Sequence, residues 1–435
     1  MIVQIKRLLI VFALVILFLP ALVYFQHKGT GDMDVWLEWT SHIDRWGPFN
    51  AYSIINTETS NKIDSNNINT NHNYWTSDYP PLTFINLWLA KKTAEVFGVS
   101  WMIGIKMMLF VYYIATWASL IYLSTLFRRK SIWENITVVS LFFFGGLYFA
   151  IISQAFTTLD ITFAPYVVFS LALFARRKYL LSGMCIALAV LVKWIAIMML
   201  PALVFYFIIK KSRQYKIETP LFKFLGAFTL VIASLIIGFW VDHLSLLSLV
   251  ESLRKSFSHG VWYFEIGALN FVYLIRYGAI QPFFPETYGM IIKNNLHIFS
   301  LISGVIFLLV DIAILKSFLK RKKDIGSLLE VSLMISWSYF IWRNGVHANH
   351  LFITVLAALC LATINTNKSN IRQYLLLSFF GLASPILTHG FPVRGGFVAL
   401  YDNYMLLLLV AAFHVLIYIV YLKRYLQFQP SGARD

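Results

Sequence analysis

Two carboxylates stand close together near the start of the chain, in the stretch GDMDVWLEW at 31–39. Acids are scarce, since the 435 residues include only 20 aspartates and glutamates, yet Asp32 and Asp34 fall within three positions and two tryptophans follow them. A carboxylate within hydrogen-bond reach of a hydroxyl can take its proton and accelerate a reaction by about 10²–10⁴-fold. An acid at a helix N-terminus is also stabilising in its own right. Asp34 therefore has three interpretations: it orients the acceptor, supports Asp32 or caps the following helix.

Other residues that could hold an anion or line a site recur along the chain, most of them beside apolar runs. They are Asp78, Tyr79, Gln154, Asp160, Lys193, Arg343, His347 and Arg394. Lys193 lies inside an apolar run, where a charge costs about 2.5–3.5 kcal/mol on insertion scales, so it either reaches an anion or extends to an interface. Asp78 either contacts a substrate or caps the turn at Pro80 and Pro81.

The two late histidines have a spacing that could hold a metal ion. His347 and His350 stand three residues apart, but no HExxH sequence and no cysteine partner accompanies them. Cys185 and Cys360 both lie inside apolar runs and are interpreted as inert core residues rather than as a disulfide or a metal site. The sequence therefore predicts no metal site and no cofactor, although a divalent metal would not conflict with the chemistry.

The composition indicates an integral membrane protein. Hydrophobic residues make up 59% of the chain and charged residues 13%, against about 25% charged in soluble domains, and the mean hydropathy is +0.70. A net charge of +16 would suggest a nucleic-acid partner in a soluble protein. Here the lysines and arginines fall in short loops between apolar runs, as the positive-inside rule predicts for cytoplasmic loops.

The basic loops predict an all-α polytopic protein that forms a single domain over 1–435. The N-terminus, with Lys6 and Arg7, is placed in the cytoplasm, and the first apolar run is long enough to be a retained anchor. A long polar-rich first outer loop covers 26–100, and a second outer segment covers 242–295. About 12 transmembrane helices follow: 8–25, 101–126, 134–153, 159–175, two short ones within 180–209 that break near Lys193 and Pro201, 221–241, 296–316, 327–342, 351–365, 373–388 and 403–422.

The first outer loop carries its own local signals. Residues 34–46 place Trp36, Trp39, Ile43 and Trp46 at near-helical spacing, which predicts an amphipathic helix in the membrane interface. Its tryptophans either anchor at the headgroup level or contact a sugar or lipid. The run Tyr79-Pro80-Pro81 predicts a rigid extended segment that leads into the next helix. All these candidates fall on the outer side, which favours chemistry at that face.

Taken together, these stretches resemble the GT-C glycosyltransferases that use lipid-phosphate sugars, and in particular the dolichyl-phosphate-glucose and -mannose enzymes. Gly31, Asp32, Asp34 and Trp39 fall on the acidic pattern of that family's first lumenal loop, and DYPPLT at 78–83 falls on its second motif. Weaker similarities follow in the same order at 151–162, 188–201, 268–274 and 345–352. The chain departs from the family at Ala348-Asn349, where Glu-Lys is usual, and in a polar insertion between the first two motifs.

The resemblance implies a GT-C fold and transfer of a sugar, with inversion, from a polyprenyl-phosphate donor to an acceptor hydroxyl of a glycan, lipid or protein. It implies Asp32 as the general base, with Asp34 second. Outer-face cations that could stabilise the leaving phosphate are His347, Arg343, Lys193 and Arg394. The residues expected at the acceptor or in the site wall are Asp78, Tyr79, Gln154, Asp160, Trp36 and Trp39.

Two other classes of function stay open. A transporter or lipid flippase would need charged residues near the midplane of several spans and repeated halves. An oligosaccharide polymerase or ligase would use arginines in a large late loop instead of an acid directly after the first span. The short cytoplasmic ends favour a prokaryotic plasma membrane with the site outside, and the endoplasmic reticulum membrane is the alternative. The departures from the family pattern leave the sugar and the acceptor open.

Overall fold

The computed structural model describes residues 18–25, 27–63, 79–209, 218–262, 268–321, 324–393, 396–398 and 404–427. Two of the candidate residues, Asp78 and Arg394, lie outside these ranges, as does most of the first predicted span. Helices account for nearly all of the described chain. Its one pair of strands is β1 (Phe391–Val393) with β2 (Gly396–Val398), which are antiparallel with Pro392 opposite Phe397.

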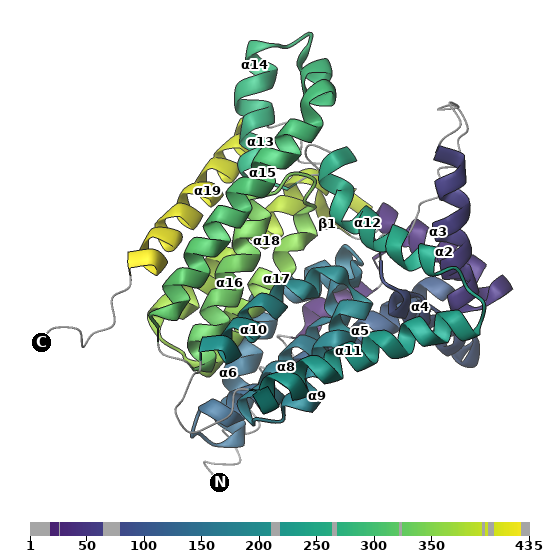
Figure 1. Ribbon diagram of the computed structural model, residues 1–435, viewed down its shortest axis with the longest axis horizontal. Coiled ribbons are helices and arrows are strands. Elements are labelled where there is room, and N and C mark those ends of the chain that lie inside the picture. Colours follow the sequence, from purple (N-terminus) through teal and green to yellow (C-terminus); the bar gives the residue numbers. More distant parts are fainter. Residues whose placement is uncertain are drawn as a thin grey trace, which may run out of the picture.

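The helices follow the chain in an order that matches the predicted apolar runs (Figure 1). They are α2 (Gly31–Trp46), α3 (Pro48–Ile63), α4 (Pro81–Phe97), α5 (Trp101–Phe127), α6 (Ile132–Gly145), α7 (Tyr148–Ala150), η1 (Ile151–Ala155), η2 (Leu159–Thr162), α8 (Ala164–Ala175), α9 (Tyr179–Val192), η3 (Trp194–Met199), α10 (Leu200–Ile209), α11 (Glu218–Val241), α12 (Leu246–Trp262), α13 (Phe271–Tyr273), η4 (Leu274–Ile280), α14 (Gln281–Phe283), α15 (Tyr288–Leu319), α16 (Ile325–Trp342), η5 (Ala348–Leu351), α17 (Phe352–Ile364), α18 (Lys368–His389) and α19 (Tyr404–Gln427).

Several of these helices are long and apolar enough to cross a membrane. By length and composition, six described segments qualify: Trp101–Phe127, Thr219–Val241, Tyr288–Leu319, Ile325–Trp342, Lys368–His389 and Met405–Gln427. A seventh qualifies if α6 and the segment Tyr148–Ala155, bent by 57°, form one broken span. This confirms a helical protein with the character of a multi-pass membrane protein. Four shorter apolar helices coincide with further predicted spans, and the count of 12 stays a prediction.

The predicted break in the 180–209 run is confirmed at Lys193. Its backbone is extended, with φ −152° and ψ 124°, and separates α9 from the 3₁₀ helix η3. The break predicted at Pro201 is wrong, because Pro201 is the second residue of α10. A proline in the first turn of a helix removes no intrahelical hydrogen bond, since that N–H has no partner there.

Helix ends that the sequence assigns to one side of the membrane do meet. The Ser124 hydroxyl lies 2.9 Å from Asn135 Oδ1 and 3.4 Å from the Thr363 carbonyl, and all three residues belong to predicted inner ends. At another predicted inner end, the Arg321 guanidinium donates to the Tyr425 carbonyl over 2.6 Å. These contacts agree with the predicted alternation of spans.

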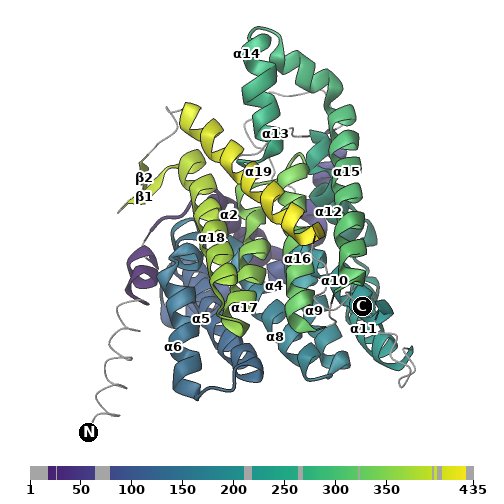
Figure 2. The same cartoon turned by 90° about the vertical axis from the view of Figure 1, so that its left-hand side faces the viewer.

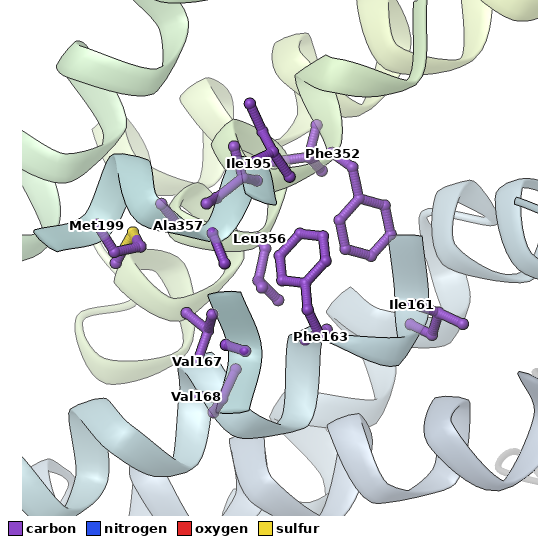
Figure 3. Close-up of a cluster of buried hydrophobic side chains, with 14 of the residues drawn as sticks. Ile161, Phe163, Val167, Val168, Ile195, Met199, Phe352, Leu356 and Ala357 are labelled. Carbon is purple, nitrogen blue, oxygen red and sulfur yellow. The ribbon is translucent and has the colours of Figure 1, made fainter. Parts of the chain in front are cut away.

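The core lies where α8, η3 and α17 meet (Figure 3). Every residue of α17 from Phe352 to Thr363 is buried, as expected for a helix that is apolar on all sides. Phe352 packs edge-on against Phe163, with ring centroids 5.5 Å apart. Figure 2 shows α17 between α18 and α16, and α17 also packs on α5, so it contacts helices from both the early and the late part of the chain.

Candidate functional site

The acidic stretch forms the first turn of α2, and hydrogen bonds to the turn at Phe156–Thr157 fix its position. Thr30, the residue before the helix, donates its hydroxyl to the Phe156 carbonyl over 3.0 Å. One turn further on, the Trp36 indole N–H donates to the Thr157 carbonyl over 3.3 Å. Asp32 and Asp34 are exposed, whereas Met33 between them is buried. Both carboxylates are therefore exposed at the start of a helix whose buried residues, Trp36 among them, hold it on the turn at Phe156 and Thr157.

Asp34 does not cap the helix, so that interpretation is wrong. The N-cap is Thr30, without a side-chain cap bond, and Gly31 is the first helical residue, which places Asp34 fourth. Both acids still lie in the first turn, where the positive end of the helix dipole favours a negative charge.

Two tryptophans of α2, Trp36 and Trp39, face protein and not the membrane interface. Trp36 is 3% exposed, Trp39 2% and Ile43 1%, and Trp39 stacks on Phe84 of α4 with ring centroids 5.0 Å apart. The prediction of an amphipathic helix is confirmed, but its apolar face packs on α3, α4 and α5. The interface-anchor interpretation of Trp36 and Trp39 is therefore wrong, because neither ring is available to headgroups.

The turn beneath α2 is held by a lysine that the sequence analysis did not single out. Lys106 of α5 is 1% exposed, and its ammonium donates to Thr157 Oγ1 over 2.8 Å and to the Gln154 carbonyl. Thr157 has a left-handed backbone, with φ 59°. A lysine inside the apolar run 101–126 was the available signal, of the same kind as Lys193. Lys106 thus fixes the backbone on which Trp36 docks.

Gly29 approaches the same turn so closely that no side chain fits. A Cβ at Gly29 would lie 2.5 Å from Thr157 Oγ1, and Gly29 has φ +89°. Gly29→Ala is expected to lower the thermal unfolding midpoint through both the clash and the left-handed backbone, which alone costs about 1–3 kcal/mol. Gly98→Ala is the matched control, because Gly98 has φ +62° and nothing within 4 Å. Equal shifts for the two variants, measured in the same detergent, would show that the close approach does not contribute.

A buried ion pair joins four distant segments next to α2. Lys193 Nζ lies 2.6 Å from Asp160 Oδ1, and Asp160 is fully buried. The other carboxylate oxygen accepts from Asn349 Nδ2 over 3.0 Å. Lys193 also donates to the Tyr79 hydroxyl over 3.2 Å. A buried charge is least costly when it is paired. The Lys193 ammonium is paired with Asp160 inside the protein and does not extend to a membrane interface.

The ion pair is linked to the acidic helix through one aromatic ring. Tyr79 packs edge-on against Trp36 and Trp39, with ring centroids 5.1 and 6.0 Å away. Its carbonyl accepts from the Ser252 hydroxyl of α12 over 2.8 Å. Five predicted wall and phosphate residues therefore come together: Trp36, Trp39, Tyr79, Asp160 and Lys193. Asn349, which the sequence marked only as a departure from the family pattern, is a direct partner of Asp160.

The remaining candidates lie apart from this cluster or have other roles. Gln154 is fully buried, its backbone carbonyl accepts from Lys106, and its side-chain amide atoms have no hydrogen-bond partner among the described residues. The backbone N–H of His347 donates to His350 Nδ1 over 3.2 Å, and His347 lies two residues before Asn349, the partner of Asp160. Arg343 donates to the Ser300 carbonyl over 3.1 Å, so it binds to α15. Burial there lowers the pKa of its guanidinium, which stays charged at neutral pH.

Comparison with known proteins adds no assignment. No family model matches the sequence, and a search of curated proteins finds no match. Across the described residues, no group of three or more His, Cys, Asp or Glu side chains is placed to hold a metal ion. What the fold and site define is a helical protein of multi-pass membrane character with two exposed acids above a buried polar cluster.

Proposed function

We propose that the protein is an inverting glycosyltransferase of the GT-C type, with about 12 spans. It moves a hexose or pentose from a polyprenyl-phosphate sugar to a hydroxyl of a glycan, lipid or protein at the outer face of a prokaryotic plasma membrane. The observation that carries the proposal is the exposure of Asp32 and Asp34 on a helix that Thr30 and Trp36 hold on the turn at Phe156–Thr157. Rigid placement of this kind is what a general base requires.

In the proposed reaction, Asp32 takes the proton of the acceptor hydroxyl as its oxygen attacks the anomeric carbon. The bond between that carbon and the phosphate oxygen breaks on the opposite face, and the lipid phosphate leaves with the electron pair. This inverts the configuration. Charge builds up on the leaving phosphate, and of the predicted cations His347 stays close to the cluster through its neighbour Asn349. Lys193 has a different role here, because Asp160 already neutralises its ammonium.

The proposal is tested with the purified full-length protein in proteoliposomes. Polyprenyl-phosphate glucose, mannose, galactose and arabinose, each radiolabelled in the sugar, are supplied with a membrane lipid extract that contains candidate acceptors. Formation of a labelled product together with free polyprenyl phosphate supports transfer. Movement of intact labelled donor across the bilayer without product would instead support the flippase alternative. Polymerisation of a lipid-linked oligosaccharide would support the polymerase alternative.

A further inference from the structure

A groove runs along one face of α15. Its volume is about 420 Å³, and its lining includes His297, Ser300, Leu301, Gly304 and Leu308 of α15 together with Arg343. The α15 positions recur every three or four residues, so they form one stripe of the helix. From His297 to Leu308 the stripe rises by eleven residue steps, which is about 16 Å along the helix axis at 1.5 Å per residue. That is close to half of the ~30 Å hydrocarbon core, the depth of one leaflet.

The groove faces the surroundings of the bundle. Leu301 is 68% exposed and Leu308 is 58% exposed, in a helix that qualifies as a membrane span and is among the least buried of the candidates. In a bilayer, such a surface is covered by lipid chains. The groove is therefore shaped and placed to receive a lipid chain along its length.

Arg343 gives this apolar groove a fixed positive charge between Ser300 and Gly304. Its Nη1 donates to the Ser300 carbonyl over 3.1 Å and lies 3.4 Å from Ser303 Oγ. It fits against Gly304, where a Cβ would be 2.7 Å from Nη1. These contacts hold the guanidinium in place, and none of the described residues that line the groove is an acid. His297, one turn before Ser300, adds a second N–H donor in either protonation state.

We propose that this groove is a binding site for an anionic membrane phospholipid. The guanidinium of Arg343 and the imidazole of His297 bind the phosphate, and one acyl chain follows Leu301 and Leu308 towards the bilayer centre. Anionic headgroups are held by cations at the membrane surface, whereas a zwitterionic headgroup brings its own ammonium and competes with them. The predicted topology places His297 at the outer end of its span, which is the headgroup level.

The occupant is a bulk phospholipid and not the sugar donor, because the groove is separated from the acidic cluster. α15 packs on α10, α12, α16 and α19, whereas α2 packs on α3, α4 and α5. Both views show α2 apart from α15 (Figure 1, Figure 2). The inference therefore does not depend on the proposed glycosyl transfer, and it holds or fails separately.

Native mass spectrometry of the full-length protein tests the site. Detergent-solubilised protein is titrated with phosphatidylglycerol and, separately, with phosphatidylcholine of the same chains. Wild-type protein is expected to bind phosphatidylglycerol about fivefold more tightly, and Arg343→Gln to lose this preference. Gly304→Leu, which fills the groove, is expected to lose binding of both lipids at this site. Gly289→Leu is the control on the same helix, because nothing lies within 4 Å of a Cβ there, and it is expected to bind as wild type does.

Each other outcome overturns the proposal. If wild type binds phosphatidylglycerol and phosphatidylcholine equally, as Arg343→Gln is expected to do, the groove has no phosphate-binding site. Unchanged binding by Gly304→Leu would place the lipid elsewhere. This variant keeps Arg343, so it tests the groove even if Arg343→Gln does not fold. Displacement of phosphatidylglycerol by inorganic phosphate would indicate a site for the free anion. Displacement by a stoichiometric amount of polyprenyl phosphate would make the occupant a donor-type lipid.

Discussion

Asp32→Asn is expected to slow sugar transfer by at least about 10²-fold while the protein stays folded, because asparagine cannot accept the proton of the acceptor hydroxyl. The fold should tolerate the change, since Asp32 is exposed and α2 docks through buried residues such as Trp36 and Trp39. Loss of the favourable dipole interaction costs only about 0.3–1 kcal/mol. The measurement is the initial rate with the donor that wild type consumes, at saturating and subsaturating concentration. The loss is expected in kcat, because the base acts in the transition state.

Two further acid-to-amide variants on the same helix serve as controls. Glu38→Gln lies one turn beyond Asp34 in α2 and is expected to transfer sugar at close to the wild-type rate. Asp34→Asn is expected to have a smaller effect than Asp32→Asn. If Asp34→Asn is the inactive variant, the base is two residues further along and the rest of the mechanism stands. If both aspartate variants match wild type, the acids only stabilise the helix and the proposed mechanism is wrong.

The features that the sequence predicted correctly are those with a local cause. Apolar runs and basic loops place helices such as α5 and α16 within a few residues, and the two prolines at 80 and 81 begin α4 as expected. The break at Lys193 was predictable too, because one long helix would have put a basic loop on the wrong side. Pro201 did not predict the break correctly, because a proline in the first turn of a helix and a proline that ends a helix look alike in the sequence.

The site itself depends on contacts between distant residues, and these have no local signature. Asn349 reaches Asp160 across 189 positions, and Lys106 reaches Thr157 across 51. The periodicity of Trp36, Trp39 and Ile43 predicted a helix with one apolar face, but the same pattern serves a helix that lies on lipid and one that lies on protein. Only the position of α4 and Tyr79 distinguishes the two cases.

The buried ion pair gives the largest expected effect on stability. Asp160→Asn or Lys193→Met alone is expected to lower the free energy of unfolding by about 3–5 kcal/mol, because each leaves an uncompensated charge in a buried site. The double variant is expected to recover most of this loss, since it removes both charges. Equilibrium unfolding in mixed micelles measures all three against wild type. Lys92→Met is the control for a surface pair: Lys92 lies 2.6 Å from Glu95 with 48% and 41% of the side chains exposed, and its loss should cost at most about 1 kcal/mol.

The same three variants separate a structural role of the pair from a direct role in the reaction. Lys193 holds Tyr79, and the Tyr79 ring packs on Trp36 and Trp39, so each single variant should loosen α2 and slow transfer. If the pair acts only by holding these rings, the double variant should regain transfer roughly in step with its stability. A double variant that is stable but inactive would mean that one of the two charges contacts the substrate. In that case Asp160 would be a candidate for the general base beside Asp32, and the exposure of Asp32 and Asp34 would no longer identify the base.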